Sequence, residues 1–289
     1  MNTDRPTRVE HPVVTDPVRG RQIDIGAGFS AMSFDHKQFD GLMDPLVIVD
    51  HFTMSEPTFG PHPHAGMSAV SVLFEDSRGL FHNRDSLGHD IDLEPGDLYW
   101  LKAGRGAVHD EGPRPGAQTH AFQVFVNLPA AAKRDAPDSL HIRAEDMPEL
   151  RGGGYRVRVV LGGSNGVSGF ASPASPLTIL DAHLEAGGGF THRLPSGHHA
   201  WIHAVRGGGQ VIVGDAVVSL ARGDAVAVGG HVKAAALELR SEEGAELVLL
   251  QGQPLREPIA QRGPFVMNTT EELAAVAAAH AAGELGSIG

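Results

Sequence analysis

The sequence contains no cysteine among its 289 residues. This absence excludes disulfide bonds, cysteine-ligated zinc, iron–sulfur clusters and thiol catalysis. Aromatic residues are scarce as well, with two tryptophans, two tyrosines and twelve phenylalanines. Any metal or acid–base chemistry must therefore depend on histidines and carboxylates.

Basic residues are fewer than acidic ones: the chain has 23 Lys and Arg and 35 Asp and Glu, which gives a net charge of −12. Binding to a phosphate backbone needs clustered basic residues, so we expect no direct nucleic-acid partner. No stretch reaches the roughly 18 apolar residues of a membrane span. The polar residues 1–14 lack the apolar block of a secretion signal. We expect a cytoplasmic protein without a membrane partner, and the lack of an obvious exposed apolar repeat favours a monomer.

Glycine and proline are plentiful, with 37 and 19 residues respectively. They separate short apolar stretches, several of which alternate with smaller or polar neighbours, as in residues 46–52, 67–75 and 121–129. Similar stretches return after Tyr155. This pattern is typical of short strands joined by turns and predicts an all-β fold.

The two halves of the chain repeat each other loosely. Gly96-Asp97 in LEPGDLYWLKAG has a counterpart in Gly223-Asp224 in LARGDAVAVGG. His62 and His64 precede a strand, as do the adjacent histidines 198 and 199. A repeat of this size indicates two similar β-domains rather than a solenoid, and we place them at residues 1–140 and 141–289.

One helix is expected, at the C-terminal end. Thr269 and Glu272 have the spacing of a capping box. They precede LAAVAAAHAAG, which is rich in the best helix former. Gly283 suits the end of that helix.

The chain has 17 histidines, and two pairs of candidate ligands share one spacing. His62 and His64 are two residues apart, so in an extended segment they point to the same face. His109 and Glu111 have the same spacing. If the two segments lie on neighbouring strands, three imidazoles and one carboxylate converge, a set that suits iron, copper, nickel or zinc and leaves coordination positions open. Surface histidines on a histidine-rich chain are the alternative interpretation.

Five stretches resemble signature sequences of the pirin family, a branch of the cupins, in order along most of the chain. They are PHPHAG (61–66), RDSLG (84–88), GDLYWLKAGRGAVHDE (96–111), PLREP (254–258) and GPFVMNTTEEL (263–273). The resemblance implies two cupin-type β-barrel (jelly-roll) domains with a C-terminal helix. It also implies one divalent metal per chain in the N-terminal barrel, usually Fe(II), with Ni, Mn, Cu and Zn as alternatives.

By motif position, the resemblance assigns the metal ligands to His62, His64, His109 and Glu111. Ordinary cupins place a glutamate soon after the histidine pair, where this chain has Ser68 and Ala69. The acid follows the third histidine instead, as in pirins. Ala65 stands where many pirins have arginine, which leaves the substrate preference open.

In the C-terminal domain no ligand set is complete. His198 and His199 are adjacent, so on a strand they face opposite ways. His231 comes too early to replace the third ligand, and neither His192 nor His203 completes a set. We therefore expect this domain to bind no metal.

The resemblance implies two kinds of function. One is a quercetinase-type flavonol 2,4-dioxygenase, an oxidoreductase that takes a small aromatic, flavonol-like substrate and O2, with Glu111 as catalytic proton acceptor. The other is a non-enzymatic, iron-dependent redox-sensing regulator that binds a protein partner. An oxygen-independent isomerase or lyase would fit the same ligands.

Overall fold

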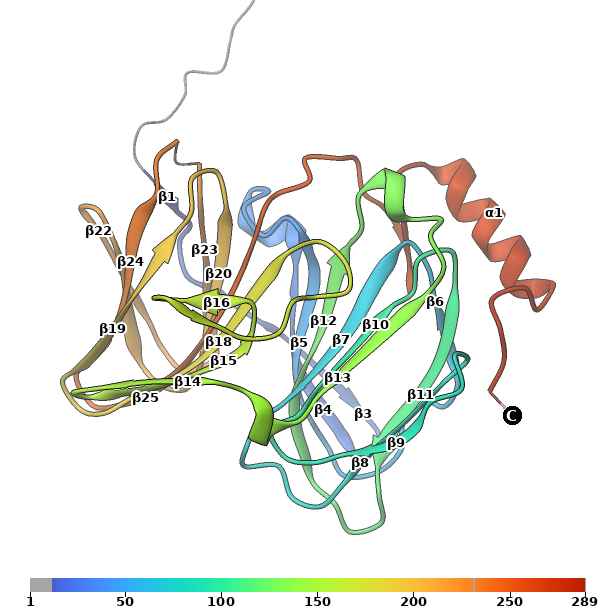
Figure 1. Ribbon diagram of the computed structural model, residues 1–289, viewed down its shortest axis with the longest axis horizontal. Coiled ribbons are helices and arrows are strands. Elements are labelled where there is room, and N and C mark those ends of the chain that lie inside the picture. Colours follow the sequence, from blue (N-terminus) through green and yellow to red (C-terminus); the bar gives the residue numbers. More distant parts are fainter. Residues whose placement is uncertain (1–11, 231, 289) are drawn as a thin grey trace, which may run out of the picture.

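The computed structural model describes residues 12–230 and 232–288. The start of the chain up to residue 11, on which the expected absence of a secretion signal largely depends, lies outside the described residues, as does His231. Strands dominate these described residues, in two side-by-side domains with an α-helix at the C-terminal end (Figure 1). The predicted all-β fold with two cupin domains and a C-terminal helix is confirmed.

The N-terminal domain consists of two antiparallel sheets that face each other (Figure 1). The larger sheet has the order β13-β10-β7-β12-β5-β4-β3 and the smaller one β6-β11-β8-β9. The strand bounds are β3 (Arg21–Ile25), β4 (Phe29–Asp35), β5 (Leu46–Met54), β6 (His62–His64), β7 (Met67–Leu73), β8 (Phe81–Asp85), β9 (Asp90–Leu93), β10 (Leu98–Lys102), β11 (Ala107–Pro113), β12 (Thr119–Asn127) and β13 (Asp138–Ile142).

The C-terminal domain repeats this plan. Its larger sheet has the order β1-β23-β20-β25-β18-β15-β14, with β2 also paired to β23, and its smaller sheet the order β19-β24-β21-β22. The strand bounds are β1 (Val13–Val14), β2 (Val18–Arg19), β14 (Glu149–Gly152), β15 (Tyr155–Leu161), β18 (Leu177–Leu184), β19 (Gly188–Leu194), β20 (His199–Gly207), β21 (Gly209–Val213), β22 (Ala216–Leu220), β23 (Asp224–Gly229), β24 (Ala235–Ser241) and β25 (Ala245–Gly252).

Short elements complete the chain. They are the 3-10 helices η1 (His36–Phe39), η2 (Ala130–Ala132) and η3 (Ala144–Asp146), the hairpins β16 (Gly163–Ser164) with β17 (Val167–Ser168) and β26 (Ala260–Arg262) with β27 (Phe265–Met267), and α1 (Thr270–Ala281). Thr269 and Glu272 form the predicted capping box at the start of α1. In the part of the chain described here, no helix has the length and apolar character needed to cross a lipid bilayer.

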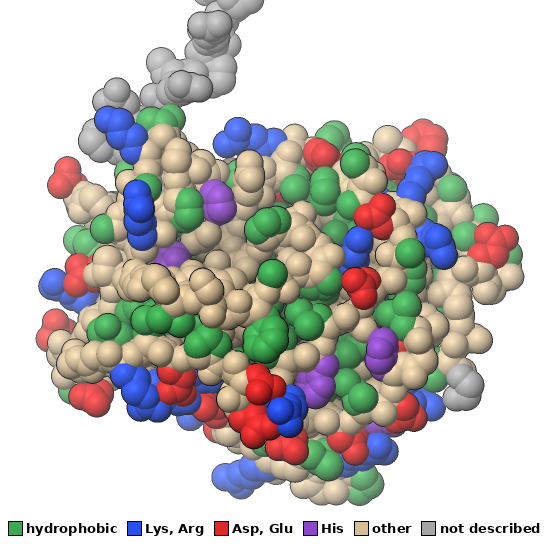
Figure 2. All heavy atoms as spheres, in the orientation of Figure 1, with side chains coloured by type: hydrophobic (Ala, Val, Ile, Leu, Met, Phe, Trp, Pro, Cys, Tyr) green, Lys and Arg blue, Asp and Glu red, His purple; other side chains and the backbone are tan. Residues whose placement is uncertain are grey.

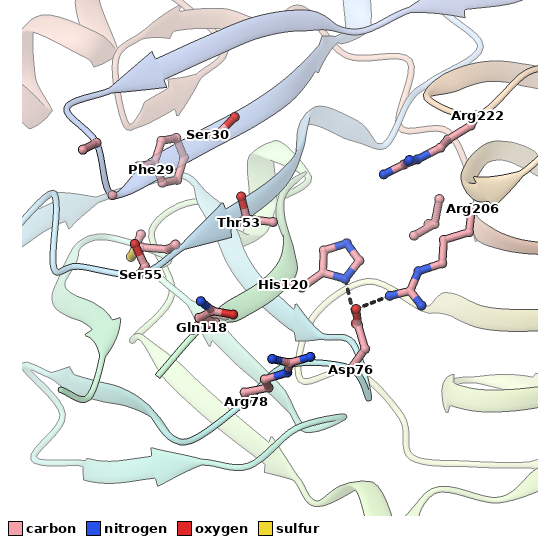
Figure 3. Close-up of a pocket in the computed structure, with 15 residues that line it drawn as sticks. Phe29, Ser30, Thr53, Ser55, Asp76, Arg78, Gln118, His120, Arg206 and Arg222 are labelled. Atoms are coloured by element: carbon pink, nitrogen blue, oxygen red, sulfur yellow. Dashed lines mark hydrogen bonds and ion pairs between the residues drawn. The ribbon is translucent and has the colours of Figure 1, made fainter. Parts of the chain in front are cut away.

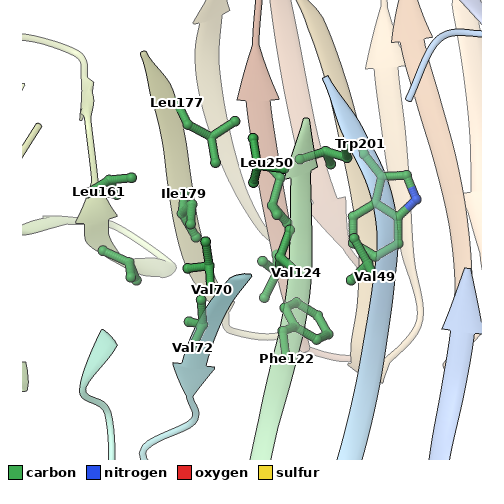
Figure 4. Packing of buried hydrophobic residues seen from close by; sticks show 14 of the residues in the cluster. Val49, Val70, Val72, Phe122, Val124, Leu161, Leu177, Ile179, Trp201 and Leu250 are labelled. Carbon is green, nitrogen blue, oxygen red and sulfur yellow. The ribbon is translucent and has the colours of Figure 1, made fainter. Parts of the chain in front are cut away.

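A shared hydrophobic core joins the two domains. Val70, Phe122 and Val124 on the larger N-terminal sheet belong to one buried cluster with Trp201 and Leu250 on the larger C-terminal sheet (Figure 4). Alternation along these strands turns one face of each large sheet toward the other domain. The domains therefore pack sheet against sheet, and residues at their junction are buried from both sides.

The two ends of the chain cross between the domains. β1 and β2 extend the large C-terminal sheet through β23. In the other direction, Phe265 pairs with Ala65 beside β6, and α1 packs on the same cluster. The domain boundary at residue 140 stays a prediction. A single boundary does not describe the two terminal segments, because each of them packs on the other domain.

Gly66 shows how closely the C-terminal segment approaches the N-terminal domain. Its φ of +72° suits glycine, and an added Cβ would lie 2.0 Å from the carbonyl oxygen of Val266. Only a residue without a side chain allows this contact. The segment is further held by Lys133, whose buried ammonium donates to the carbonyls of Gly66 and Val266 at 2.8 and 2.9 Å.

Charges of both signs are mixed on the surface. On the face shown in Figure 2, Lys and Arg side chains lie among Asp and Glu side chains around the rim, and no continuous basic stripe crosses that face. This distribution agrees with the excess of acidic residues in the sequence. That face offers no electrostatic footprint for a nucleic acid.

Candidate metal centre

Three histidines meet on neighbouring strands of the smaller N-terminal sheet. β6 and β11 pair so that His109 lies opposite His62 and Ala107 lies opposite His64. Nε2 of His109 is 2.9 Å from Nε2 of His62 and 2.9 Å from Nε2 of His64. The convergence that the spacing predicted on neighbouring strands is therefore present for the imidazoles.

The chemistry of this donor set fits a metal ion. Two nitrogens that bind one ion at right angles, each about 2.1 Å away, lie about 3.0 Å apart. The observed Nε2–Nε2 separations of 2.9 Å match this expected distance between two ligand nitrogens. All three imidazoles belong to a group whose ligand atoms lie within 4.8 Å of one another. Three such nitrogens around one point leave further coordination positions to other donors.

The surroundings of the imidazoles favour the neutral tautomers that bind a metal. Nδ1 of His62 lies 2.9 Å from the carbonyl oxygen of Gly60, so it carries the proton and leaves the Nε2 lone pair free. Burial and the neighbouring imidazole of His62 lower the pKa of His64 to about 3. Burial, followed by the charges of His64 and His62, holds the pKa of His109 well below its usual value. Both buried rings are neutral at physiological pH, which is the form that binds metals.

Glu111 lies beside the cluster, on the strand that carries His109. Its carboxylate oxygens are outside the group of mutually close ligand atoms formed by the imidazoles. The Ser71 hydroxyl donates a 2.7 Å hydrogen bond to Oε1 of Glu111. Burial raises the pKa of Glu111 to about 7, with the Ser71 hydrogen bond opposing that rise.

A cavity of about 240 Å³ opens in front of this cluster. His62, His64 and Glu111 contribute polar groups to its wall. The remaining walls are largely apolar and come from distant parts of the chain, including the C-terminal segment; they are Phe29, Phe52, Met54, Phe59, Phe81, Phe125 and Pro264. The cavity therefore combines a few converging polar groups with aromatic walls, as small-molecule sites do.

Two further polar residues contribute to this cavity, and only Asp50 has a signal in the sequence. Asp50 and Gln123 both line it. Asp50 sits in the middle of the apolar strand β5, and burial raises the pKa of its carboxyl. A carboxylate inside the run LVIVDHF was the available signal, since a buried acid is rare without a role or a partner.

The C-terminal domain arranges its histidines differently. β19 and β24 occupy the places that β6 and β11 have in the N-terminal sheet, and Leu237 lies opposite His192. His192 instead contacts Ser164 at 2.9 Å and Gln251 at 2.6 Å. Nδ1 of His198 lies 3.0 Å from Nε2 of Gln251. The absence of metal from this domain stays a prediction.

A second group of close ligand atoms lies at the domain junction. It consists of Glu75, Asp181 and His183. Arg156 donates two hydrogen bonds of 2.6 Å to the carboxylate of Glu75, and Arg158 lies 3.3 Å from Asp181. The two guanidinium groups already neutralise these carboxylates, so the group serves as an interdomain charge network.

The fold and the site together define the class of protein: a two-domain cupin with a histidine cluster in its N-terminal domain. Two family models match the chain, Pirin over residues 29–126 and the Pirin C-terminal cupin domain over residues 179–286. Pirin from Mus musculus is 34% identical over 232 residues, which cover 80% of this chain and 79% of the mouse protein. The chain belongs to the pirin family, as its sequence motifs indicated.

Other relatives carry names that point to an activity or a metal. A putative quercetin 2,3-dioxygenase from Pseudomonas aeruginosa is 34% identical over 243 residues, covering 80% of this chain and 82% of that protein. The crystal structure of a quercetin 2,3-dioxygenase from Acinetobacter baumannii superposes with a TM-score of 0.84 at 28% identity, covering 96% and 100% of the two chains. A bacterial pirin from Escherichia coli in complex with nickel(II) shares the fold, with a TM-score of 0.63 at 16% identity, over 84% of this chain and 99% of that one.

Proposed function

We propose that this pirin is a metal-dependent dioxygenase that cleaves a flavonol-like aromatic substrate with O2. The observation that carries the proposal is the pair of 2.9 Å separations among the Nε2 atoms of His62, His64 and His109 at the wall of a cavity lined by aromatic side chains. Relatives named quercetin 2,3-dioxygenase support the substrate class. Fe(II) is the metal we propose, with one ion per chain.

In this proposal His62, His64 and His109 hold the ion, with Glu111 as a fourth, loosely held ligand. The bound ion would supply a Lewis-acid centre that lowers the pKa of an enol hydroxyl on the substrate. The Ser71 hydroxyl holds Oε1 of Glu111 by a 2.7 Å hydrogen bond and fixes the orientation of the carboxyl. The carboxylate of Glu111 accepts the enol proton.

The aromatic walls bind and orient the substrate. Phe29 and Phe52 stack with ring centroids 5.6 Å apart, and Phe59 meets Phe29 edge-on at 5.0 Å. A planar ring system can pack against these aromatic walls, and its burial excludes water from the reacting edge. Pro264 closes the cavity from the C-terminal segment. The exchanged chain end is thereby part of the proposed substrate site.

The test is aerobic turnover of quercetin by the metal-reconstituted protein. Loss of the flavonol absorbance and release of carbon monoxide are followed after loading with Fe(II), Ni(II), Mn(II), Cu(II) or Zn(II) in parallel, because site affinity alone does not select iron. We expect metal-dependent turnover that disappears on chelation. A fully loaded protein without turnover would contradict the proposal and favour the regulator that binds a protein partner, or an oxygen-independent reaction.

A further inference from the structure

A second cavity, larger than the one at the histidine cluster, lies at the junction of the two domains. Its volume is about 490 Å³, against about 240 Å³ for the cavity in front of the cluster. Residues of the N-terminal domain, among them Thr53 and Gln118, form one side, and Val205 and Arg222 of the C-terminal domain contribute the other. We call it the interdomain cleft. The proposed dioxygenase chemistry makes no use of it.

Three guanidinium groups line the interdomain cleft. Arg78 follows β7, Arg206 is the second-last residue of β20, and Arg222 lies in the turn between β22 and β23. Figure 3 shows Arg206 and Arg222 reaching in from one side and Arg78 from below, around His120. Three cations from two domains thus converge in one concavity of a chain whose net charge is −12.

Among the described residues that line the cleft, one carries a carboxylate, and it does not balance the charge of these three cations. Asp76 pairs with Arg206, which also lies 3.3 Å from Glu246, and Asp76 contacts His120 at 2.7 Å. Among residues 12–230 and 232–288, the guanidinium groups of Arg78 and Arg222 have no ion pair. Two positive charges are therefore left facing the same open volume.

Polar groups without charge complete the lining. Ser30, Thr53 and Ser55 lie along the wall opposite Arg206 and Arg222, with Gln118 between them and Arg78 (Figure 3). Guanidinium groups bind carboxylates and phosphates with paired hydrogen bonds, and hydroxyl and amide groups bind the neutral parts of such molecules. A volume of this size accommodates an ordinary metabolite.

We propose that the interdomain cleft binds a small molecule carrying two or more carboxylate or phosphate groups, through Arg78, Arg206 and Arg222. This inference is independent of the proposed function, since none of the three arginines lines the cavity at the histidine cluster. Phe29 and Met54 line both cavities, so an occupied cleft would lie directly behind one wall of the proposed substrate site.

The experiment is calorimetric titration of the full chain with citrate and, separately, with inorganic pyrophosphate at low salt. We expect at least one probe to bind with submillimolar affinity that weakens as salt rises, because exposed charge pairs are screened. Citrate binding alone would identify a polycarboxylate site, and pyrophosphate binding alone a phosphate site. Binding of neither probe would overturn the proposal.

Substitutions of the cleft arginines test whether the anion binds in the interdomain cleft. Arg222→Glu and Arg78→Gln are expected to weaken binding by about tenfold or more, the effect of losing one charge-assisted contact. Arg105→Gln is the matched control, because Arg105 is exposed and does not line the cleft. Arg206 is left unchanged, since its partners Asp76 and Glu246 make it part of the domain junction. Equal weakening in the Arg105 control, or none in the two cleft variants, would place the anion elsewhere and contradict the assignment.

Discussion

Nδ1 of His51 lies 3.0 Å from Nε2 of His203, so two imidazoles 152 residues apart join the two domains inside their shared core. Nε2 of His51 lies 2.6 Å from Nε2 of His120, whose Nδ1 is 2.7 Å from Asp76. At the other end, Nδ1 of His203 is 3.0 Å from the carbonyl oxygen of Asp224. The result is a continuous chain of four contacts from the interdomain cleft into the C-terminal sheet.

The number of protons needed to make every contact in this chain a hydrogen bond can be counted. Both of its ends are acceptors, so four contacts need four protons, whereas three neutral imidazoles carry three. Burial is the main cause that lowers the pKa of His51, His120 and His203, the last to about 3. Burial of all three rings therefore disfavours the fourth proton, and a fall in pH favours its uptake.

His51→Ala should destabilise the whole protein, because it removes the central imidazole and leaves His120 and His203 without their shared partner. We expect the free energy of unfolding to fall by about 2–4 kcal/mol, from a lost buried ring and two lost contacts. Urea denaturation followed by fluorescence of the interfacial Trp201 measures it. His82→Ala is the control: His82 lies near the surface, paired with Asp90, and should change stability by less than about 0.5 kcal/mol. Equal losses in the two variants would contradict the role given to His51.

Local spacing predicted the histidine cluster, because ligands two residues apart on a strand share a face whatever the tertiary fold. His51 and His203 carry no such signal. Their contact depends on how two sheets pack, and no local pattern encodes that packing.

Local sequence patterns also did not predict which domain each terminal segment packs against. The capping box predicted α1 correctly, but nothing in Thr269 or Glu272 indicates which domain the helix packs against. Lys133 lies in the polar stretch AAAKRDAPDS, which has no periodic apolar residues, yet its ammonium is buried against the crossing segment. Long-range contacts of this kind become visible only once both sheets are in place.

His109→Ala should remove the metal, because His109 is the imidazole whose Nε2 lies 2.9 Å from both of the others. We expect the metal content, measured by mass spectrometry of the reconstituted protein, to fall from about one ion per chain to near zero. The His82→Ala variant serves again as a control, since its imidazole lies outside the cluster. Full retention of metal in His109→Ala would contradict the site assignment. Binding near two ions per chain would contradict the expectation of a metal-free C-terminal domain.

Glu111→Gln should separate chemistry from metal binding. The amide keeps the shape and can still accept the Ser71 hydrogen bond, but it cannot accept a proton. We expect the three imidazoles to retain the metal while kcat for quercetin falls by about 10²–10⁴, the usual contribution of a general base. Asp50→Asn is the matched control, because Asp50 is a second carboxyl lining the same cavity. A larger loss of kcat in Asp50→Asn than in Glu111→Gln would move the base to Asp50.

Phe59→Ala should weaken substrate binding with little effect on the fold. Phe59 lines the cavity and contacts the rings of Phe29 and His62, yet the residue is 49% exposed. Loss of one aromatic contact of about 0.5–1.5 kcal/mol raises KM roughly 2–10-fold and leaves metal content unchanged. Steady-state kinetics with quercetin measures both constants. An unchanged KM would show that the substrate does not reach this side of the cavity.

Lys133 should make stability depend on alkaline pH. Its ammonium donates to Gly66, Asn127 and Val266, and burial lowers its pKa to about 8 from the usual 10.5. Between these two values the unfolded chain keeps a proton that the folded chain has lost, so folding stability rises with pH in this interval. Below pH of about 8 both states carry the proton, and the folded state bears the full cost of burying the charge.

Lys133→Met tests that account by removing the titrating group. We expect the wild-type protein to gain stability relative to Lys133→Met as the pH rises from about 8 to about 10.5, as measured by urea denaturation at several pH values. Lys37→Met, at an exposed lysine, should show no such trend relative to the wild-type protein. A difference between wild type and Lys133→Met that is constant over the whole interval would mean that Lys133 stays charged in the fold. The three carbonyl groups around it would then compensate fully for its burial.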